Sequence, residues 1–286
     1  MSIEIILSGF TDNKWTSCWY SPNTNTGLGN FLFQISSVLG LAWDNKTEAV
    51  CPLINIYCDS ENINKNDSIW RNVNVTKINI SKQIEVPHGY KPNIFKYYPN
   101  VAYSGHFQCY KYFHRYKKRL QNFFGPNKAD LNYISKYEHF LKQKTCSLHV
   151  RRGKDFEEIA RKWNPEFLLR KSYYDKAIDF MKDKVDIFLV FSDNTDYCKS
   201  TFNEENYPGI EFIFIRERDF IDLWIISLCD HHITSNSTFS WWGAYLNKKD
   251  TKIIIAPKKS VFLEKINHKD ELIKDYYFND WIILDE

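Results

Sequence analysis

The sequence predicts an α/β fold with a parallel β-sheet, and two observations support this prediction. Short apolar runs with the composition of β-strands alternate with helical patterns along the second half of the chain. Polar side chains follow several of these runs, and open parallel sheets bind ligands beyond the carboxyl ends of their strands. The 286 residues suffice for two domains of ordinary size, which we expect at 1–144 and 145–286.

The first half begins with an Ile-rich strand pattern at 3–7, followed by a polar segment at 8–26 that contains several aromatic residues. A helix then opens at the sequence Gly27-Leu28-Gly29-Asn30. A glycine pair at a helix start lets backbone N–H groups approach an anion, although such a pair alone is more often an ordinary turn. The apolar face of this helix is predicted from helical spacing at Leu28, Leu32, Ile35, Leu39 and Ala42.

The remainder of the first half carries few chemical signals. Residues 48–99 have the pattern of short strands and Asn-rich loops, 101–107 of a strand, and 109–124 and 130–142 of two helices. Basic residues recur in the first of these helices with the spacing of a solvated amphipathic face. With a net charge of only +3, this pattern does not favour a nucleic-acid binder. The basic positions are Lys111, Arg115, Lys118 and Arg119.

The second half has a regular strand–helix order. We expect a helix to begin at Ser172 with a capping-box pattern and another, apolar nearly all round, to be buried at 220–228. The short strand at 231–234 runs into a Ser- and Thr-rich start of a third helix, a pattern that caps helices and can also hold a phosphate. The predicted strands are 145–150, 187–191, 210–215, 231–234 and 252–256.

The most informative stretch is the end of the strand at 145–150. His149 lies at the end of this strand, and Arg151 and Arg152 follow it directly. We expect a loop at Gly153. Two guanidinium groups can hold a diphosphate or a carboxylate, because each planar fork bonds two anionic oxygens and keeps its charge. A structural ion-pair cluster at a strand end is the alternative explanation. Asp193 and Ser235 follow other predicted strands in the same way, which favours a site.

Composition excludes some classes of protein. Seven cysteines at scattered positions, without Cys-x-x-Cys, support neither a disulfide framework nor a zinc ribbon, and reduced thiols suit the cytoplasm. No apolar run approaches the ~18 residues of a membrane span, and the first residues lack the pattern of a signal peptide. Peripheral contact with a membrane stays open. No Asp-x-Asp motif is present to hold a metal ion on a diphosphate.

Several blocks together resemble the α-1,2-fucosyltransferase family. The resemblance covers about residues 27–260, and its most specific parts are His-Val-Arg-Arg at 149–152 and Ser-Thr-Phe-Ser-Trp-Trp-Gly-Ala at 237–244. The blocks are Gly27 to Gln34, Gly105 to Phe113, His149 to Gly153, Ser172 to Ile178, Phe191 to Asp193, Asp222 to Ala244 and Ile254 to Lys259.

This resemblance implies a GT-B-like fold, in which two Rossmann-like domains face each other with the donor site at their interface. The domain at 1–144 would be the acceptor side and the domain at 145–286 the GDP-sugar side. The implied activity is inverting transfer of L-fucose from GDP-fucose to a glycan, in α-1,2 linkage to a terminal galactose-like sugar. No metal or other cofactor is expected.

The resemblance also implies roles for individual residues. Arg151 and Arg152 would hold the diphosphate, with Arg152 nearest the leaving oxygen and serving catalysis. Asp155 and Glu157, with Glu158, are candidates for the catalytic base. Gly29 and Asn30 would approach the diphosphate from the first domain. The rest of the expected GDP-sugar site is His149, Asp193, Ser237, Thr238, Phe239 and Ser240.

The sequence departs from the family pattern in three places. Lys154 stands where the family has an acid, and Asp155 follows one position later, so either a bulge restores the acid or the lysine replaces it. One amide of the family's first block is lost at Phe31–Leu32, and about twenty extra residues precede the glycines. The alternatives are therefore another GDP-sugar or linkage on the same fold, or a carbohydrate-binding protein without turnover.

Overall fold

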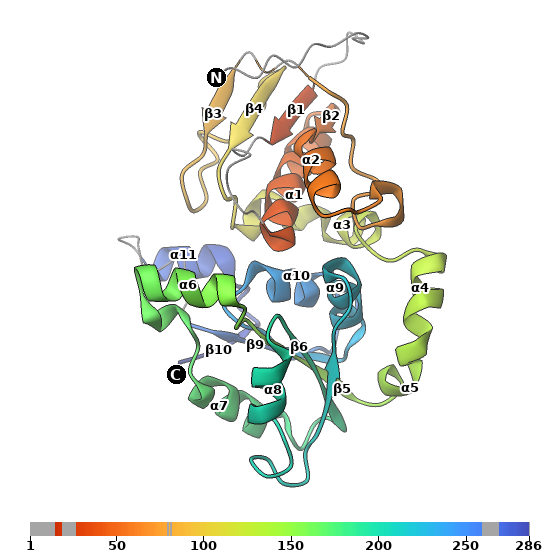
Figure 1. Cartoon of the computed structure of the whole chain (residues 1–286). Helices are drawn as coiled ribbons and strands as arrows, with labels where there is room; N and C mark the ends of the chain where they lie inside the picture. Colours follow the sequence, from red (N-terminus) through yellow and green to blue (C-terminus); the bar gives the residue numbers. More distant parts are fainter. Residues whose placement is uncertain (1–14, 19–26, 79, 81, 259–268, 286) are drawn as a thin grey trace. The chain divides into compact units, whose positions relative to one another are not determined.

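The computed structural model describes residues 15–18, 27–78, 80, 82–258 and 269–285 (Figure 1). The chain divides into two compact units, Met1–Gly125 and Pro126–Glu286. The division falls ahead of the boundary expected between 144 and 145. Each unit has its own parallel β-sheet with helices, so the predicted α/β class is confirmed for both. The predicted strand at 3–7 lies outside the described residues.

The first unit contains a four-stranded parallel sheet in the order β2-β1-β4-β3. Its strands are only three or four residues long. The elements are β1 (Trp15–Cys18), α1 (Leu28–Asp44), β2 (Glu48–Val50), α2 (Leu53–Ser60), the 3₁₀ turn η1 (Lys65–Asp67), β3 (Gln83–Glu85), β4 (Val101–Ser104), η2 (Tyr110–Tyr112), η3 (His114–Tyr116) and α3 (Lys117–Phe123).

Helix α1 confirms the helix predicted after Gly27. Gly27 is its N-cap in an extended conformation, and the helix ends at Asp44 with Asn45 as C-cap. The helix is buried almost all round from Leu28 to Ala42, and the predicted apolar stripe is only part of the buried surface. It therefore forms the centre of the first unit, and contacts β1, β2 and η2.

Two predictions for the first unit are wrong in detail. β1 lies inside the polar segment at 8–26, for which we predicted no strand, and it pairs with both β2 and β4. The helix expected at 109–124 is broken into η2, η3 and α3. The break occurs at Phe113, whose ring is fully buried against Phe33 of α1, so tertiary packing overrides the continuous helical pattern there.

The second unit contains a six-stranded parallel sheet in the order β10-β9-β8-β5-β6-β7. Figure 1 shows α7 and α8 on one side of this sheet and α9 and α10 on the other. The elements are α4 (Lys128–Ile134), η4 (Ser135–Tyr137), α5 (Glu138–Leu141), β5 (Thr145–Val150), α6 (Lys154–Trp163), η5 (Pro165–Phe167), α7 (Lys171–Met181), β6 (Ile187–Ser192), α8 (Thr195–Thr201), β7 (Glu211–Ile215), α9 (Asp219–Leu228), β8 (His231–Ile233), α10 (Thr238–Leu246), β9 (Ile254–Pro257), α11 (Lys269–Tyr276) and β10 (Ile282–Leu284).

Strand β5 is buried along its whole length and organises this unit. Cys146, Leu148 and Val150 point to one face, where they join an apolar cluster that includes Tyr173 and Ile178 of α7. The alternate positions carry the polar side chains Thr145, Ser147 and His149 to the other face. The strand therefore alternates polar and apolar residues, although both of its faces are buried.

The strand order has a direct consequence for ligand binding. The chain runs from β5 outward through β6 to β7 and then crosses to the other side of β5, where β8, β9 and β10 follow. This is the order of a Rossmann-like sheet, in which the direction of winding reverses between the first and fourth strands. The reversal lies between β5 and β8, and such sheets bind ligands outside the carboxyl ends of the strands at this point.

Three predictions for the second unit need correction. Residues 154–163, which follow the expected loop at Gly153, form helix α6. Helix α7 begins before Ser172, and its N-cap Arg170 makes no side-chain capping bond. The helix expected at 130–142 starts earlier, at an Asn127 capping box, and is interrupted by η4.

Candidate functional site

The site begins at the reversal point, where His149 of β5 meets the segment that follows β8. The imidazole Nδ1 lies 2.8 Å from Ser235 Oγ, and its ring is 5.3 Å from the ring of Phe239 at the start of α10. His149, Ser235 and Phe239 were each expected near the site, and the structure brings them together. They meet because β5 and β8 are paired parallel strands, so their carboxyl ends lie at the same edge of the sheet.

The turn from β5 to α6 is made by Arg151, Arg152 and Gly153. Gly153 is the N-cap of α6, with φ −66° and ψ 153°, and these angles are open to any residue. A glycine is nevertheless required by space, because a Cβ at this position would lie 2.5 Å from Asp193 Oδ2 and 2.7 Å from Asp155 Oδ1. The turn therefore packs its backbone directly against two carboxylates.

Asp193, which follows β6, holds this turn in place. One of its carboxylate oxygens accepts a hydrogen bond of 2.7 Å from the backbone N–H of Arg152. The other accepts from Arg151 Nη1, in an ion pair whose carboxylate is 17% exposed. We expected Asp193 in the GDP-sugar site; the structure shows its carboxylate bonded to the arginine turn.

Arg151 also pairs with Asp155, which lies four residues later in the first turn of α6. The side chain of Asp155 is 62% exposed, so this second ion pair is in contact with solvent. Two carboxylates thus surround one guanidinium. The ion-pair cluster that the sequence left open as an alternative is present, and a ligand anion would compete with Asp155 for Arg151.

Arg152 points in another direction. Its Nη2 donates a hydrogen bond of 2.8 Å to the carbonyl of Leu169, and its guanidinium lies 4.8 Å from the ring centre of Tyr197. Its own carbonyl accepts from Asn194 Nδ2 at 3.2 Å. Two guanidinium groups therefore flank the N-terminus of α6, one in the ion-pair cluster and one beside an aromatic ring.

Burial fixes the charge of the histidine in this site. It lowers the pKa of His149 to about 4; the nearby Asp193 acts in the opposite direction, and Arg151 lowers the pKa further. The imidazole is therefore neutral at pH 7. It can exchange one hydrogen bond with Ser235 and offers no charge to a ligand.

The start of α10 has the predicted capping residues, but their hydroxyl groups bond within the turn. Ser237 is the N-cap, and its Oγ accepts from the backbone N–H of Phe239 at 3.3 Å. Ser240 Oγ donates to the carbonyl of Ser237 and accepts from the backbone N–H of Ser235, both at 3.2 Å. Thr238 is half-buried as the first residue of the helix.

The candidate bases lie in the first turn of α6. Lys154 is its first residue and Gly153 its cap, so no bulge precedes Asp155. Glu157 is half-buried, while Glu158 is exposed. The acidic first turn is favourable for the helix itself, because it opposes the positive end of the helix dipole.

The remaining predicted residues, Gly29 and Asn30, belong to the first turn of α1 in the first unit. Asn30 Oδ1 accepts from Gln108 Nε2 at 3.0 Å, which joins α1 to the segment after β4. Gln34 Nε2 donates to the carbonyl of Gly105 at 3.1 Å in the same segment. Both hydrogen bonds connect the block Gly27–Gln34 with the block Gly105–Phe113, although the bonded residues are 71 and 78 positions apart in the sequence.

Sequence analysis overlooked a histidine pair near this segment. The rings of His88 and His106 stack with centroids 4.9 Å apart, and burial lowers the pKa of His106 to about 4. They follow β3 and β4, which are adjacent parallel strands. The sequence therefore contained a signal for this pair, because each histidine comes two or three residues after a strand.

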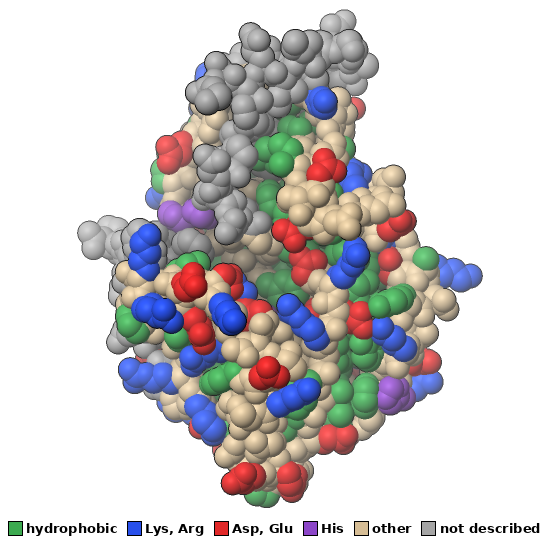
Figure 2. Space-filling view, in the orientation of Figure 1, with side chains coloured by type: hydrophobic (Ala, Val, Ile, Leu, Met, Phe, Trp, Pro, Cys, Tyr) green, Lys and Arg blue, Asp and Glu red, His purple; other side chains and the backbone are tan. Residues whose placement is uncertain are grey.

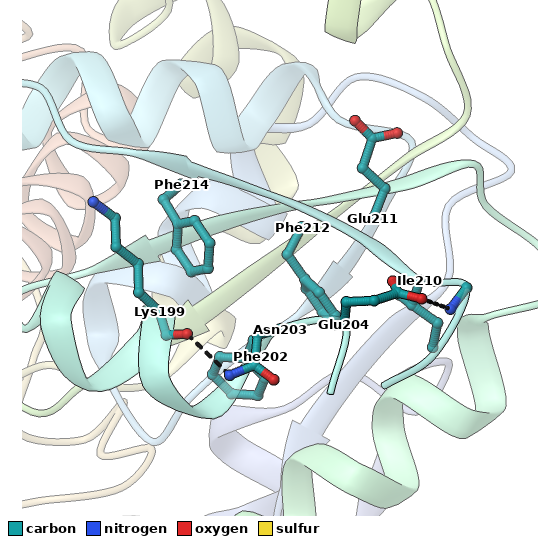
Figure 3. Close-up of a pocket in the computed structure, with 9 residues that line it drawn as sticks. Lys199, Phe202, Asn203, Glu204, Ile210, Glu211, Phe212 and Phe214 are labelled. Atoms are coloured by element: carbon teal, nitrogen blue, oxygen red, sulfur yellow. Dashed lines mark hydrogen bonds between the residues drawn. The ribbon is translucent and has the colours of Figure 1, made fainter. Parts of the chain in front are cut away.

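A cavity of about 490 Å³ lies elsewhere, beside the edge strand β7 and the end of α8 (Figure 3). Phe202, Phe212 and Phe214 form its apolar wall, and Lys199 and Glu204 lie at its border. None of the residues expected to bind or transform a ligand lines it. We therefore assign the candidate site to the carboxyl ends of β5, β6 and β8.

Neither a metal centre nor a membrane helix is found in the described part of the chain. No group of three or more His, Cys, Asp and Glu side chains there is arranged to hold a metal ion. No helix there combines the length and apolar composition needed to cross a membrane.

Comparison with known proteins identifies the family. The α-1,2-colitosyltransferase of Escherichia coli is 31% identical over 175 residues, which are 60% of each chain. The O-antigen biosynthesis glycosyltransferase WbnK of Escherichia coli is 36% identical over 140 residues, or 47% of this chain and 44% of that protein. The chain thus spans 60% and 44% of the length of these two relatives, in each case less than two thirds.

Among solved structures, a mutant of the Arabidopsis thaliana protein FUT1 in complex with GDP aligns with a TM-score of 0.48 and 14% identity, over 87% of this chain and 71% of that one. The model of glycosyl transferase family 11 matches residues 16–285. This match extends over both units and includes every residue of the candidate site, and the chain therefore belongs to glycosyl transferase family 11.

Proposed function

We propose that this protein is an inverting glycosyltransferase that moves L-fucose from GDP-fucose to a glycan, in α-1,2 linkage to a terminal galactose-like sugar. The main support is the turn Arg151-Arg152-Gly153, which joins β5 to α6 where the winding of a Rossmann-like sheet reverses. A diphosphate is bound at this turn in dinucleotide-binding sheets, because the helix N-terminus offers N–H groups and a positive dipole. Family membership and the α-1,2 relatives favour a nucleotide-sugar donor over other anions.

In this proposal, the diphosphate of the donor lies against Arg151, Arg152 and the first turn of α6. Arg151 keeps its bond to Asp193 and exchanges its solvent-exposed partner Asp155 for a phosphate oxygen. The exchange is inexpensive, because an exposed ion pair contributes only about 0–1 kcal/mol. His149 and the segment Ser237–Ser240 border the nucleotide, and Gly29 and Asn30 are proposed to contact the diphosphate, as the family resemblance implies.

The proposed reaction is a single displacement at the anomeric carbon of the donor sugar. The acceptor hydroxyl attacks that carbon and passes its proton to a carboxylate, for which we propose Asp155, with Glu157 as the alternative. The bond to the diphosphate breaks, and Arg152 stabilises the charge that develops on the leaving oxygen. No step is assigned to a metal ion.

The proposed location is the cytoplasm. Six of the seven cysteines are free and buried, as is usual in a reducing compartment: Cys51, Cys58, Cys109, Cys146, Cys198 and Cys229. Its partners in this proposal are the nucleotide sugar and a glycan acceptor, without nucleic acid.

The test is to incubate the protein with a panel of GDP-sugars and galactose-terminated oligosaccharides, to measure GDP release, and to determine the linkage of the product. GDP-fucose should give an α-1,2-linked product, and Arg152→Ala should lower the rate of GDP release without unfolding the protein. Products with another linkage would contradict the acceptor assignment. Absence of product and of GDP release with every donor would leave a non-catalytic carbohydrate-binding protein.

A second donor is favoured by one specific comparison. The relative with the larger alignment is named as a colitosyltransferase, so a colitosyl donor belongs in the same panel. A higher kcat/KM with that donor than with GDP-fucose would reassign the sugar and leave the linkage and the diphosphate site unchanged.

A further inference from the structure

The charges of the first unit are distributed very unevenly. Residues 86–125 contain seven of the chain's 38 Lys and Arg residues and none of its 35 Asp and Glu residues. The chain as a whole is nearly balanced, and on the face of the second unit drawn in Figure 2 side chains of both signs are interspersed. The acid-free stretch includes the loop after β3, strand β4, η2, η3 and α3.

Most of these cations face solvent. Two of them differ: the charge of Arg115 is compensated by an ion pair with Asp44 of α1, and the side chain of Lys117 is half-buried. From η2 to α3 the exposed cations are Lys111, Arg115, Lys118 and Arg119, and the positions between them are buried or half-buried. We define the basic surface as Lys91 and Lys96 of the loop after β3 and Lys111 of η2, together with the exposed apolar side chains Tyr90 and Ile94.

The loop that carries part of this surface is held firmly by Tyr112 of η2. Its hydroxyl accepts from the backbone N–H of Lys91 at 2.6 Å and donates to the carbonyl of Gly89 at 2.9 Å. Its ring contacts those of Phe95 and Tyr90, with centroids 5.0 and 5.2 Å apart. Cations and apolar side chains from two segments thus share one preformed surface.

The exposed apolar side chains among the cations restrict the kind of partner that the basic surface can bind. Tyr90 is 40% and Ile94 is 37% exposed, and Lys111 Nζ lies 5.8 Å from the Tyr90 ring centre. An aromatic and an aliphatic residue set among lysines can enter the headgroup region of a bilayer while the ammonium groups meet anionic lipids. No acidic residue of the stretch opposes such contact.

We propose that the basic surface binds the surface of an anionic lipid membrane. The predicted strength comes from several weak contacts, since each lysine near an anionic bilayer strengthens binding by about fivefold. Binding would retain the protein at a membrane without any spanning helix. This inference concerns the first unit alone and does not depend on the transfer reaction proposed above.

The experiment is sedimentation of the full chain with vesicles of phosphatidylcholine alone and with vesicles that also contain ~30% phosphatidylglycerol, at low salt. The protein should sediment with the anionic vesicles only, and added salt should weaken binding because it screens exposed charges. The triple variant Lys91→Gln, Lys96→Gln, Lys111→Gln should bind about a hundredfold more weakly.

The matched control makes the same charge change on the second unit, with Lys162→Gln, Lys199→Gln and Lys248→Gln, all exposed positions. It should retain binding within a few fold. Equal loss in both variants, or no binding of wild type to anionic vesicles, would overturn the proposal.

The apolar part of the surface separates a membrane from other polyanions. Ile94→Ser should weaken binding to vesicles, whereas binding of an RNA oligonucleotide would depend on the lysines alone. If the protein binds the RNA but not the vesicles, the surface is a nucleic-acid site and the membrane assignment is wrong. Transfer to a soluble acceptor, measured for the same variants, should be unchanged, which separates this test from that of the proposed function.

Discussion

Replacing Gly153 by alanine tests the site most directly, because the added methyl group acts on its geometry and leaves its charges unchanged. The backbone at Gly153 allows alanine, since φ is −66°. The new Cβ would lie 2.5 Å from Asp193 Oδ2, so this oxygen must retreat by roughly 0.9 Å to reach an ordinary contact at 3.4 Å. Asp155 can turn away into solvent, but Asp193 is tied to Arg151 and to the backbone of Arg152.

The magnitude follows from the bonds that this retreat disturbs. A hydrogen bond to a charged group contributes about 1.5–3 kcal/mol, and overpacking of a tight site costs about 1–3 kcal/mol. We expect Gly153→Ala to lower the free energy of unfolding by about 2 kcal/mol, which is a decrease in Tm of roughly 4–8 °C for the second unit. We also expect GDP to bind at least about tenfold more weakly, because the arginine turn is displaced.

The assays are thermal unfolding and calorimetric titration with GDP. Gly27→Ala is the control, because no atom lies within 4 Å of the Cβ that it would introduce. Because Gly27 is the N-cap of α1 and alanine is a poorer cap than glycine, the effect of this control on unfolding should stay within about 1 kcal/mol. If Gly153→Ala binds GDP as tightly as wild type and melts at the same temperature, the turn is not held as described and the diphosphate assignment loses its support.

Four further predictions concern charge, pH and metal ions. Arg152→Ala should reduce kcat about a hundredfold, and Arg152→Lys should restore little of it because the planar fork is lost; near wild-type turnover of the lysine variant would refute the role. Asp155→Asn should reduce turnover at least about tenfold while GDP affinity is kept or increased, and full turnover would exclude it as the base. Because the pKa of His149 is lowered in the folded protein, the unfolded chain takes up a proton first as the pH drops, and the free energy of unfolding should fall between pH 6.5 and about 4 by up to about 1.4 kcal/mol per pH unit. In urea unfolding, the His149→Gln variant should show a shallower dependence of this free energy on pH. An equal slope for the variant and the wild type would contradict this prediction. Turnover should persist in EDTA, and a loss restored by Mn²⁺ would contradict the metal-independent mechanism.

The elements predicted correctly are those whose burial dominates their sequence. Helix α1 and strand β6 are buried along nearly their whole length, so their apolar runs are long and unambiguous, and the buried strand β5 alternates apolar with polar residues. Strand β1 was missed because Trp-Thr-Ser-Cys has no apolar pattern, and its pairing with β2 and β4 is what makes it a strand. Helix α6 was missed because we expected Gly153 to begin a loop, whereas it caps a helix.

The candidate site could be predicted as a set of residues but not as a set of contacts. The approach of His149 to Ser235 follows from the strand order, which places β8 beside β5 although 80 residues separate them, and local patterns contain no information on that adjacency. The pairing of Arg151 with Asp155 requires the first turn of α6. The role of Asp193 could not be deduced either, since its carboxylate could equally have faced a ligand.

The strand order also has a consequence for how the second unit folds. Strands β5, β6 and β7 are neighbours both in the chain and in the sheet, so this half can form from contacts of moderate sequence separation. The pairing of β5 with β8 closes a much longer loop and is expected to form later and more slowly. The His149–Ser235 contact exists only after that step. We therefore expect partial opening between the two half-sheets to abolish ligand binding before most of the secondary structure is lost.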